Sequence, residues 1–539
     1  MRVLLRCDGG GSLGVGHVMR SLALAEAAVA AGHEVVVVGR FKGEFLQGQL
    51  AAAPVEVFQL PAREPDADGD PLDVEVIERL GTPDVLHVDS YETNGWFMGS
   101  FVLSNMEDGT FGRGSADVVI DPTLGAELSA RPEDGSRWLL RGSRYTPLRR
   151  RVIDARTGDD LAGKDGVAKV ARAVLVVMGG TDPIGLAPAA VALLALTGLE
   201  LEVTVIAVGE NAERARAAAQ GSRLSLQVLA PVDDLGALMS RQDLVVSAAG
   251  TSVWELCCIG VPAAVVWTVD NQCEGYNRVV EAGAAVGLGG PDLGSDDGVA
   301  DLLKAALTDS RRRLALVLAG RQVVDGLGAW RVVRTWEMAH RQGSRRERSL
   351  GSGSALGPGA SDADASDADA SALVLRPATV QDARQLWLWR NDPVTRAGSR
   401  LSTEVSWEDH LGWLTASFTR RDRILLMAED AVGAVGTVRW DLVTASEGER
   451  AGDHREWEVS ITVAPQRRGQ SLARPLLRAG EVVLSERMRS LGSGVTAYLA
   501  VVHLDNAGSV RLFETSGYVP DLPPDPRGFM RYRKVARVL

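Results

Sequence analysis

Short runs of apolar residues alternate with alanine- and leucine-rich stretches over the first 340 residues of the chain. The runs at 2–7, 33–39 and 84–89 are apolar along most of their length rather than at every second position. This pattern is typical of strands that are buried on both faces in a parallel sheet covered by helices. We therefore predict α/β structure, with a helix from about 18 to 31 between the first two strands.

The alternating pattern starts twice. It pauses around 139–150, LLRGSRYTPLRR, and a new apolar run begins near Ala173. We predict two Rossmann-like lobes, at 1–150 and 151–342, that face each other across a cleft. Ligands in such sheets bind beyond the carboxyl ends of the strands, so the turns at those ends are the place to look for a site.

The last part of the chain, 373–539, shows a different order of elements. One strand is followed by two helices, three strands, a long helix, another strand and a last helix. An antiparallel meander that enters a helix predicts a mixed α+β unit. Between the two parts, 343–372 contains no aromatic residue and a tandem SDADA, which predicts a disordered linker because so little apolar surface can be buried.

The bulk composition excludes several classes of protein. A chain of 539 residues is long enough for more than one domain. Four cysteines without a CxxC spacing argue against a disulfide framework and a zinc site, and we predict no metal. The net charge of −12 arises upstream of 373–539, which itself carries +3, and argues against polyanion binding by the large N-terminal part; we predict no nucleic-acid partner. We see no run of about 18 apolar residues and no secretory signal, so we expect a cytoplasmic protein without a membrane span.

The first predicted strand-to-helix turn lies within 6–25, RCDGGGSLGVGHVMRSLALA. Glycines such as Gly14 and Gly16 permit close backbone approach, and the following helix directs its N–H groups to the same space, which suits an anion. His17 lies at the mouth of this turn, and imidazole is the usual proton carrier at neutral pH. The alternative is a tight connection without a chemical role.

Three turns of the second predicted lobe contain candidate ligand contacts. MGGTDP at 178–183 and SAAGTSVWE at 247–255 place small and hydroxyl residues at helix starts, where they would bind a diphosphate. Glu255 lies one turn into its helix, where it would accept ribose hydroxyls or only complement the helix dipole. Asn271 and Gln272 follow the strand AAVVWT as neutral partners for sugar hydroxyls.

These motifs together resemble the UDP-2,4-diacetamido-2,4,6-trideoxy-β-L-altropyranose hydrolases of pseudaminic acid synthesis, which share the GT-B fold of MurG-type glycosyltransferases. The resemblance covers roughly 1–340. It differs at 9–11, GGG, where relatives more often have a small polar residue after the aspartate, and at 105–117, where relatives often have a double aspartate and this chain keeps Asp108 after Glu107. It implies that Asp8 and His17 lie at the reaction centre. The UDP-sugar contacts implied or predicted are Gly14, Gly16, Arg20, Gly179, Gly180, Thr181, Asp182, Gly250, Thr251, Ser252, Glu255, Asn271 and Gln272.

The implied reaction is attack of water on the anomeric carbon with departure of UDP. His17 is the predicted base, with Asp8 orienting either the imidazole or the water, and helix N-termini at Gly180 and Gly250 stabilise the diphosphate. A glycosyltransferase needs the same nucleotide contacts with an acceptor in place of water. A non-catalytic unit that binds a UDP-sugar is the third alternative.

After a predicted strand ending near Val463, the chain continues as PQRRGQSLARPLL at 465–477. A helix N-terminus beside arginines suits the phosphates of CoA. The segment resembles the pyrophosphate loop of GNAT acetyltransferases, and 506–518 resembles that family's N-x-x-S-x-x-L-(Y/F)-E-x-x-G-(F/Y) helix. The resemblance implies acetyl-CoA as cosubstrate, bound by Val463, Gln466, Arg467, Arg468, Gly469, Gln470, Ser471, Asn506, Ser509 and Phe513.

Phe513 stands where many GNAT enzymes have a tyrosine that protonates the departing thiolate, so the proton donor stays open. Glu458 shares one strand face with Ser460 and Thr462, and it is the candidate base, acting through a water; the alternative is a solvated strand residue. The segment WRNDP at 389–393 resembles N-acetyltransferases that act on UDP-4-amino-4,6-dideoxy sugars. The sequence therefore predicts two consecutive steps on one chain, acetylation of a UDP-linked amino sugar and release of its UDP.

Overall fold

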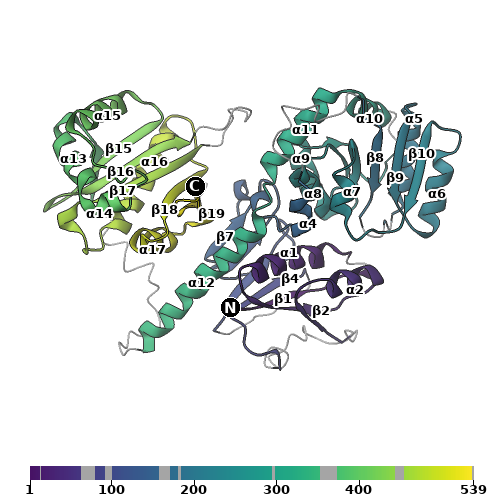
Figure 1. Ribbon diagram of the computed structural model, residues 1–539, viewed down its shortest axis with the longest axis horizontal. Helices are drawn as coiled ribbons and strands as arrows, with labels where there is room; N and C mark the ends of the chain where they lie inside the picture. The colour runs from purple at the N-terminus through teal and green to yellow at the C-terminus, as the bar shows by residue number, and fades with distance from the viewer. Residues whose placement is uncertain are drawn as a thin grey trace. The chain divides into compact units, whose positions relative to one another are not determined.

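The computed structural model describes residues 1–11, 14–61, 79–91, 100–156, 170–179, 182, 184–293, 298–351, 373–443 and 455–536. These residues fall into two compact units, Met1–Ser344 and Arg345–Leu539. The N-terminal unit contains two parallel sheets, and the C-terminal unit contains one mixed sheet (Figure 1). The predicted fold class, two Rossmann-like lobes followed by an α+β unit, is confirmed.

The first lobe is built on a seven-stranded parallel sheet, with strands counted among the described residues. Its order is β3 (Glu56–Gln59), β2 (Glu34–Gly39), β1 (Arg2–Cys7), β4 (Val85–Asp89), β5 (Val102–Met106), β6 (Val118–Asp121) and β7 (Trp138–Arg141). The direction of strand addition reverses between β1 and β4. Cys7 therefore lies opposite Asp89, and their carboxyl ends flank the crevice in which ligands of such sheets bind.

The second lobe repeats this topology with six described strands. Its order is β10 (Leu224–Leu229), β9 (Leu201–Ile206), β8 (Ala173–Val177), β11 (Leu244–Ala248), β12 (Ala263–Val266) and β13 (Val286–Gly287). The reversal lies between β8 and β11, where Val177 pairs with Ser247. The two glycine-containing turns singled out in the sequence follow these two strands.

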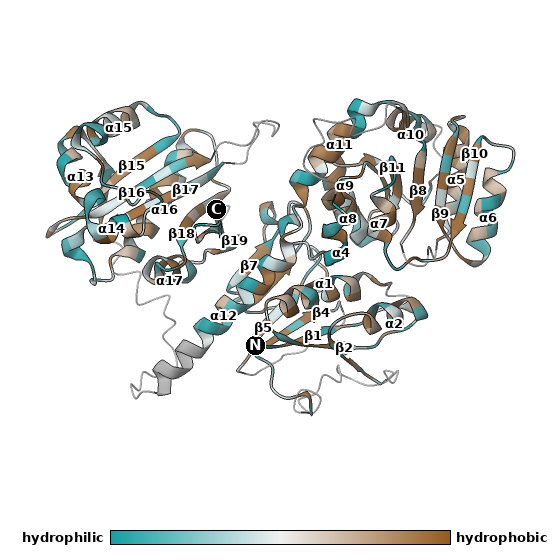
Figure 2. Ribbon diagram, viewed as in Figure 1, coloured by the Kyte–Doolittle hydropathy of each residue, from teal (hydrophilic) through white to brown (hydrophobic). Residues whose placement is uncertain are grey.

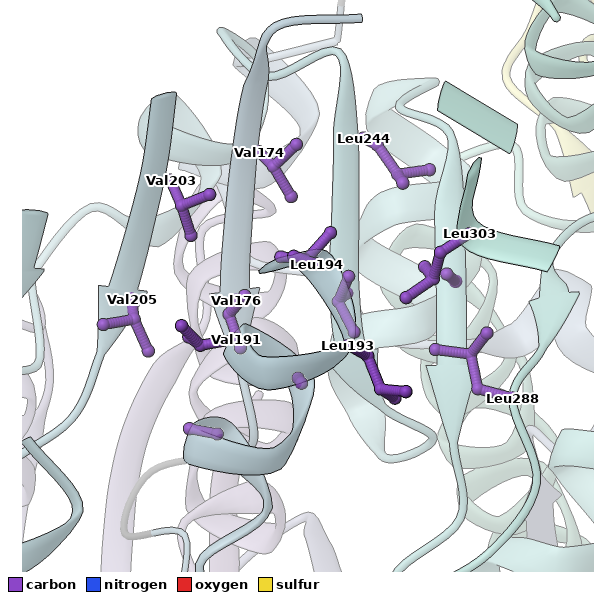
Figure 3. Packing of buried hydrophobic residues seen from close by; sticks show 14 of the residues in the cluster. Val174, Val176, Val191, Leu193, Leu194, Val203, Val205, Leu244, Leu288 and Leu303 are labelled. Atoms are coloured by element: carbon purple, nitrogen blue, oxygen red, sulfur yellow. The ribbon is translucent and has the colours of Figure 1, made fainter. Parts of the chain in front are cut away.

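Helices cover both faces of the second sheet, which explains why its inner strands β8 and β12 are apolar at every position. Val174 and Val176 of β8 pack against α5 (Leu186–Leu196) and α10 (Gly298–Thr308). Leu175 and Val177 point the other way, toward α8 (Thr251–Ile259). Figure 3 shows the first of these cores, with Val191, Leu193 and Leu194 of α5 among the strand side chains. Figure 2 shows the same strands in hydrophobic colours and α6 (Gly209–Ala219) as largely hydrophilic.

The long helix α12 (Gly328–Gly351) packs on the first lobe, although the sequence placed it with the second. Trp336 donates a hydrogen bond to Ser104 Oγ at 2.9 Å, and His33 donates to Glu337 at 2.9 Å. The hydrophobic pattern indicates that a helix face is buried but not which sheet buries it. The helix also continues beyond 342 into the predicted linker, where arginine, glutamate and leucine favour helix up to Gly351. The rest of that linker, 352–372, lies outside the described residues.

The remaining helices of this unit connect the strands or border the turns. They are α1 (Gly16–Ala30), α2 (Glu44–Ala51), α4 (Arg150–Asp154), α7 (Leu235–Met239), α9 (Cys273–Glu281) and α11 (Ser310–Val323), with short 3-10 turns that include η4 (Asp270–Gln272). No described helix of the chain has the length and apolar character that a membrane crossing needs.

The C-terminal unit has a seven-stranded mixed sheet, again counted over its described residues. Its order is β14 (Val374–Pro377), β15 (Arg423–Asp430), β16 (Gly433–Val443), β17 (Glu456–Val463), β18 (Ala497–His503), β20 (Phe529–Val535) and β19 (Val519–Leu522). β17 and β18 are parallel, and the other pairs are antiparallel. The helices are α13 (Ala383–Asn391), α14 (Pro393–Ala397), α15 (Trp407–Thr419), α16 (Ala473–Ser490) and α17 (Ala507–Thr515).

The two faces of this mixed sheet differ in character. A side-chain carbon added at Gly480 of α16 would lie 2.9 Å from Val438 and 3.4 Å from Trp440, so α16 packs closely on their face of β16. Arg439 and Asp441 alternate with these residues and therefore point to the opposite face. One face is thus a hydrophobic core, and part of the other is charged.

Candidate functional site

The first lobe joins a histidine and a carboxylate at the point where its strand order reverses. His17, in the first turn of α1, donates from Nδ1 to Asp89 Oδ1 at 2.6 Å. Asp89 is the last residue of β4, and it is 1% exposed. The other imidazole nitrogen, Nε2, has no partner among the residues that the structure describes. A carboxylate on Nδ1 fixes the tautomer in which Nε2 can accept a proton.

A buried arginine holds the carboxylate of this pair. Arg20 donates from Nε to Asp89 Oδ2 and from Nη2 to Asp89 Oδ1, both at 2.6 Å. Burial alone would raise the pKa of Asp89, but Arg20 and His17 hold that pKa well below its usual range. Asp89 is therefore an ionised acceptor for the imidazole at neutral pH.

Two further side chains complete this network. Arg20 Nη1 donates to both oxygens of Asp108, at 2.7 and 2.8 Å, and the Tyr91 hydroxyl donates to the same carboxylate. The Tyr91 ring meets the His17 ring edge to face, with 4.6 Å between centroids. The sequence singled out neither Asp89 nor Tyr91 as site residues. A polar residue at the end of a buried apolar strand was the available signal.

Asp8 makes a separate set of contacts. It accepts hydrogen bonds from Arg6 at 2.8 Å and from the backbone N–H of Arg40 at 2.7 Å. Arg40 follows β2, whereas the partner of His17 comes from β4 on the other side of β1. Asp89, not Asp8, is therefore the carboxylate that orients the imidazole, which corrects the assignment made from sequence. A contact of Asp8 with the attacking water stays a prediction.

The second lobe presents the start of α8 to the glycine-rich turn of the first. A carbon added at Gly16 would lie 3.5 Å from Thr251 Cγ2. Gly250 caps α8 without a side-chain hydrogen bond, so the helix N–H groups have no competing cap. A carbon added at Gly250 would lie 3.5 Å from Gln272 Nε2, and Gln272 is held by two hydrogen bonds from Thr268. The structure thus brings four predicted contact residues together next to His17, namely Gly16, Gly250, Thr251 and Gln272.

The turn after β8 uses its carboxylate internally. Asp182 accepts from the N–H groups of Leu186 and Ala187, both at 2.9 Å, and so caps α5. Gly179 and Asp182 have positive φ angles of 76° and 42°, and a pocket lined by both residues and Asn211 opens beside them. Gly180 and Thr181, two predicted diphosphate contacts, lie outside the described residues. Contacts of this turn with a diphosphate stay a prediction.

Glu255 of α8 is half-buried and faces two arginines of α4 and its border. Burial raises the pKa of Glu255 to about 7, although Arg151 and Arg149 oppose that rise. Arg149 is itself bonded to Glu26 at 2.6 Å, and Arg151 to Gln49 at 2.6 Å. Asn271 is exposed on η4, and Ser252 is half-buried in α8. The predicted roles of these residues toward ribose and sugar stay predictions.

In the C-terminal unit, the parallel strands β17 and β18 pair along only half their length. Glu456–Val459 of β17 pair with Ala497–Ala500 of β18. The second half of β17, which ends at Val463, does not pair with β18. Backbone groups of that half are therefore available on this side. The predicted pyrophosphate loop follows directly. Gly469 and Ser471 have positive φ angles of 78° and 58°, and nothing lies within 4 Å of a carbon added at Gly469.

Both arginines of this loop are paired with carboxylates. Arg467 binds Asp430 at 2.6 Å and its own loop neighbour Gln470 at 2.9 Å. Arg468 binds Asp392 of the WRNDP segment at 2.6 Å. The arginines thus anchor the loop to the domain, and their contacts with CoA stay predictions.

Other predicted residues of this unit have contacts of their own. Glu458 accepts from Arg400 at 2.8 Å. Asn506 caps α17 by accepting from the N–H of Ser509 at 3.1 Å. Phe513 is 4% exposed, and its ring packs on Tyr518 with 5.0 Å between centroids. The ring of Phe513 is thus part of the core, and its contact with CoA stays a prediction.

Comparison with known proteins matches the two units separately. Residues 372–519 match the family model of the acetyltransferase (GNAT) domain, and 174–303 match that of the glycosyltransferase family 28 C-terminal domain. The chain joins a family 28-like unit to a GNAT acetyltransferase domain. The resemblance seen in the sequence is confirmed at this level. The sugar substrate and the hydrolytic reaction belong to the proposal below.

Relatives along the whole N-terminal unit are distant. The spore coat polysaccharide biosynthesis protein SpsG of Bacillus subtilis is 26% identical over 341 residues, which is 62% of this chain and 96% of the relative. An uncharacterized protein of Methanocaldococcus jannaschii is 20% identical over 332 residues, and the match spans 60% of each chain.

Two solved structures illustrate the two parts. MurG of Acinetobacter baumannii is 17% identical, with a TM-score of 0.45 and coverage of 62% of this chain and 99% of that one. The spermidine N-acetyltransferase of Vibrio cholerae, in complex with CoA and spermine, is 19% identical, with a TM-score of 0.26 and coverage of 31% and 96%.

Proposed function

We propose that the chain is a bifunctional enzyme of nucleotide-sugar metabolism. The N-terminal unit hydrolyses a UDP-2,4-diacetamido-2,4,6-trideoxyhexose to UDP and the free sugar, and the GNAT domain acetylates a UDP-4-amino sugar with acetyl-CoA. The observation that carries the first activity is the His17–Asp89 pair, whose Nε2 is unpartnered among the described residues, beside the start of α8. The GNAT match carries the second.

In the hydrolytic step His17 is the general base. Its Nε2 takes a proton from water as the water oxygen bonds to the anomeric carbon, and the bond from that carbon to the diphosphate oxygen breaks with its electrons. Asp89 keeps the proton on Nδ1 and stabilises the imidazolium that forms. Charge on the leaving diphosphate is stabilised by the N–H groups at the start of α8, around Gly250 and Thr251.

In the acetyl-transfer step the GNAT domain binds the CoA diphosphate through the backbone N–H groups near Gly469 and the start of α16. The open space at Gly469 and the half of β17 that does not pair with β18 fit this ligand. Acetyl-CoA, when bound, supplies the acetyl group. Glu458 takes the proton of the attacking amine through a water, and the acceptor enters beside Arg400, with which Glu458 is paired.

A glycosyltransferase is the second candidate for the N-terminal unit, because the matching family model is one of glycosyltransferases. The two reactions differ in the attacking group. The test incubates the UDP-diacetamido sugar with the full chain in ¹⁸O-labelled water and no other acceptor. Stoichiometric UDP without ¹⁸O in its phosphates, together with free sugar, supports hydrolysis at carbon. Release of UDP only after an acceptor is added would assign a glycosyltransferase instead.

A further inference from the structure

An unusual group of arginines borders the candidate base of the GNAT domain. Arg390 of α13 donates to the carbonyl of Leu401 at 2.8 Å, and Arg396 of α14 approaches the next carbonyl, that of Ser402, at 3.5 Å. One short loop therefore brings both guanidinium groups together. The same loop begins with Arg400, which binds Glu458 at 2.8 Å.

The neighbouring strands add two more arginines. Arg423 of β15 and Arg439 of β16 share one carboxylate, that of Asp441, at 2.5 and 2.7 Å. Arg439 lies opposite Ser460 of β17, and Asp441 lies opposite Glu458, so Arg439 is the diagonal neighbour of Glu458 across the strand pair, with a backbone separation of about 7–8 Å. The arginines thus surround the place where an acceptor amine would meet Glu458.

Positive charge exceeds negative charge among these ion pairs. The five arginines named above pair with only three carboxylates. Glu404 pairs with Arg396, and Glu458 pairs with Arg400. Asp441 pairs with both Arg423 and Arg439. Arg390 Nη1 and Arg396 Nε are buried without a hydrogen-bond partner among the described residues. Leaving such donors unpaired is unfavourable, so a ligand that supplies acceptors is the simplest explanation.

The surroundings of Arg390 agree with this view. Burial lowers the pKa of Arg390, and the charges of Arg396 and Arg439 lower it further. Arg396 and Arg439 are accessible from solvent, with side chains 24% and 31% exposed. An anion can therefore reach these two, with Arg390 behind them.

We propose that Arg396 and Arg439, with the charge of Arg390 behind them, bind the diphosphate of a nucleotide-linked amine, the acceptor of the acetyl group. A diphosphate carries the two negative charges that the cluster lacks, and guanidinium groups bind phosphate oxygens in pairs. In such an acceptor one sugar ring separates the diphosphate from the amine, which matches the separation of Arg439 from Glu458. This inference rests on the proposed acetyl transfer and adds the residues that select a nucleotide-linked substrate.

The test compares two acceptors in initial-rate assays of CoA release by the full chain. One is a UDP-4-amino-4,6-dideoxy sugar, and the other is the methyl glycoside of the same amino sugar. Arg396→Gln and Arg439→Gln should each raise KM for the UDP-linked amine about tenfold, the effect of one lost charged hydrogen bond, with kcat nearly unchanged. The rate with the methyl glycoside should stay the same.

Arg487→Gln is the matched control, because it removes the same charge from an exposed position of α16, which packs on the other face of the sheet. It should leave both acceptors unaffected. The phosphates of CoA are the other possible anion, so KM for acetyl-CoA is measured alongside. The proposal would be overturned if KM for acetyl-CoA rose and KM for the UDP-linked amine did not. It would also be overturned if the arginine variants lost activity equally with both acceptors, or if they changed the kinetics of neither acceptor.

The same assay separates this inference from the proposed function. If the unaltered protein acetylates the methyl glycoside as efficiently as the UDP-linked amine, the diphosphate subsite is refuted while amino-sugar acetylation stands. If it acetylates neither amine, the proposed function fails, and the inference fails with it.

Discussion

The two lobes of the N-terminal unit share a topology but place different chemistry at the same point. Where the strand order reverses in the first lobe, polar side chains of α1 and of the strand ends bond to one another, with His17 and Arg20 bonded to Asp89 and Arg20 also bonded to Asp108. In the second lobe the turn after β11 carries glycine and threonine at the start of α8, which has no side-chain cap, and the carboxylate of the turn after β8 caps α5. In the proposed hydrolysis this difference becomes a division of labour, in which the first lobe moves protons and the second holds the nucleotide.

The largest effect is expected from removing the imidazole, which tests whether the first lobe supplies the general base. His17→Ala should lower turnover of the UDP-sugar by roughly 10²–10⁴, the usual loss for a general base, with UDP affinity nearly unchanged. His17→Asn should be nearly as poor, since an amide holds a water but cannot take its proton. Turnover assays and UDP titrations check both. His340→Ala, a partly exposed histidine of α12, is the control. Turnover of His17→Ala within about fivefold of the unaltered protein would remove histidine from the mechanism.

The next effect in size concerns the carboxylate behind the imidazole. Asp89→Asn should reduce kcat by up to about 10⁴-fold, because the imidazole loses the carboxylate that fixes its tautomer, while KM changes little. It also leaves the charge of Arg20 less compensated, so thermal stability should fall. Kinetics and melting curves on the same samples separate the two effects. Equal turnover at saturating substrate would mean that the pair only stabilises the fold.

A change in the second lobe should behave in the opposite way. Gly250→Asp places a carboxylate at the N-cap of α8, where it favours the helix but repels a diphosphate, so KM and the Kd for UDP should rise about tenfold. The kcat value should fall little, and the melting temperature should hold or rise. Gly250→Asn is the matched variant, with the same shape and no charge, and it should bind UDP better than Gly250→Asp. Unchanged UDP affinity in both would place the diphosphate elsewhere.

The smallest expected effect is on the pH dependence of stability. The pKa of Glu255 is raised to about 7 by burial, against roughly 4.3 for an unperturbed glutamate. The folded state therefore binds the proton more tightly, and the stability that this gives is present below the unfolded pKa and lost as pH rises toward 7. Glu255→Gln should flatten this fall in urea midpoints between pH 4.5 and 7. Glu213→Gln, at an exposed site, should not. Identical pH profiles for the unaltered chain and Glu255→Gln would contradict the assignment.

The sequence predicted the strands and most helices because burial on both faces leaves a strong apolar signal. It also predicted that His17 and the turn at Gly250 lie at a site. It missed Asp89 because the partner of His17 lies 72 residues away, and no local pattern encodes a contact between two strand ends. For the same reason the pairing of Arg468 with Asp392 and the placement of α12 on the first lobe were not visible.

Helix α12 also bears on the order in which the chain folds. The first lobe is completed by contacts between residues 304 apart, as for His33 and Glu337, whereas the second lobe uses a continuous stretch of chain between them. During synthesis the second lobe can therefore form its sheet while the first still lacks its closing helix. Until that helix emerges, the groove that Trp336 fills beside Ser104 stays open to water. A chain that ends shortly before residue 328 would therefore have a complete second lobe and an incomplete first lobe.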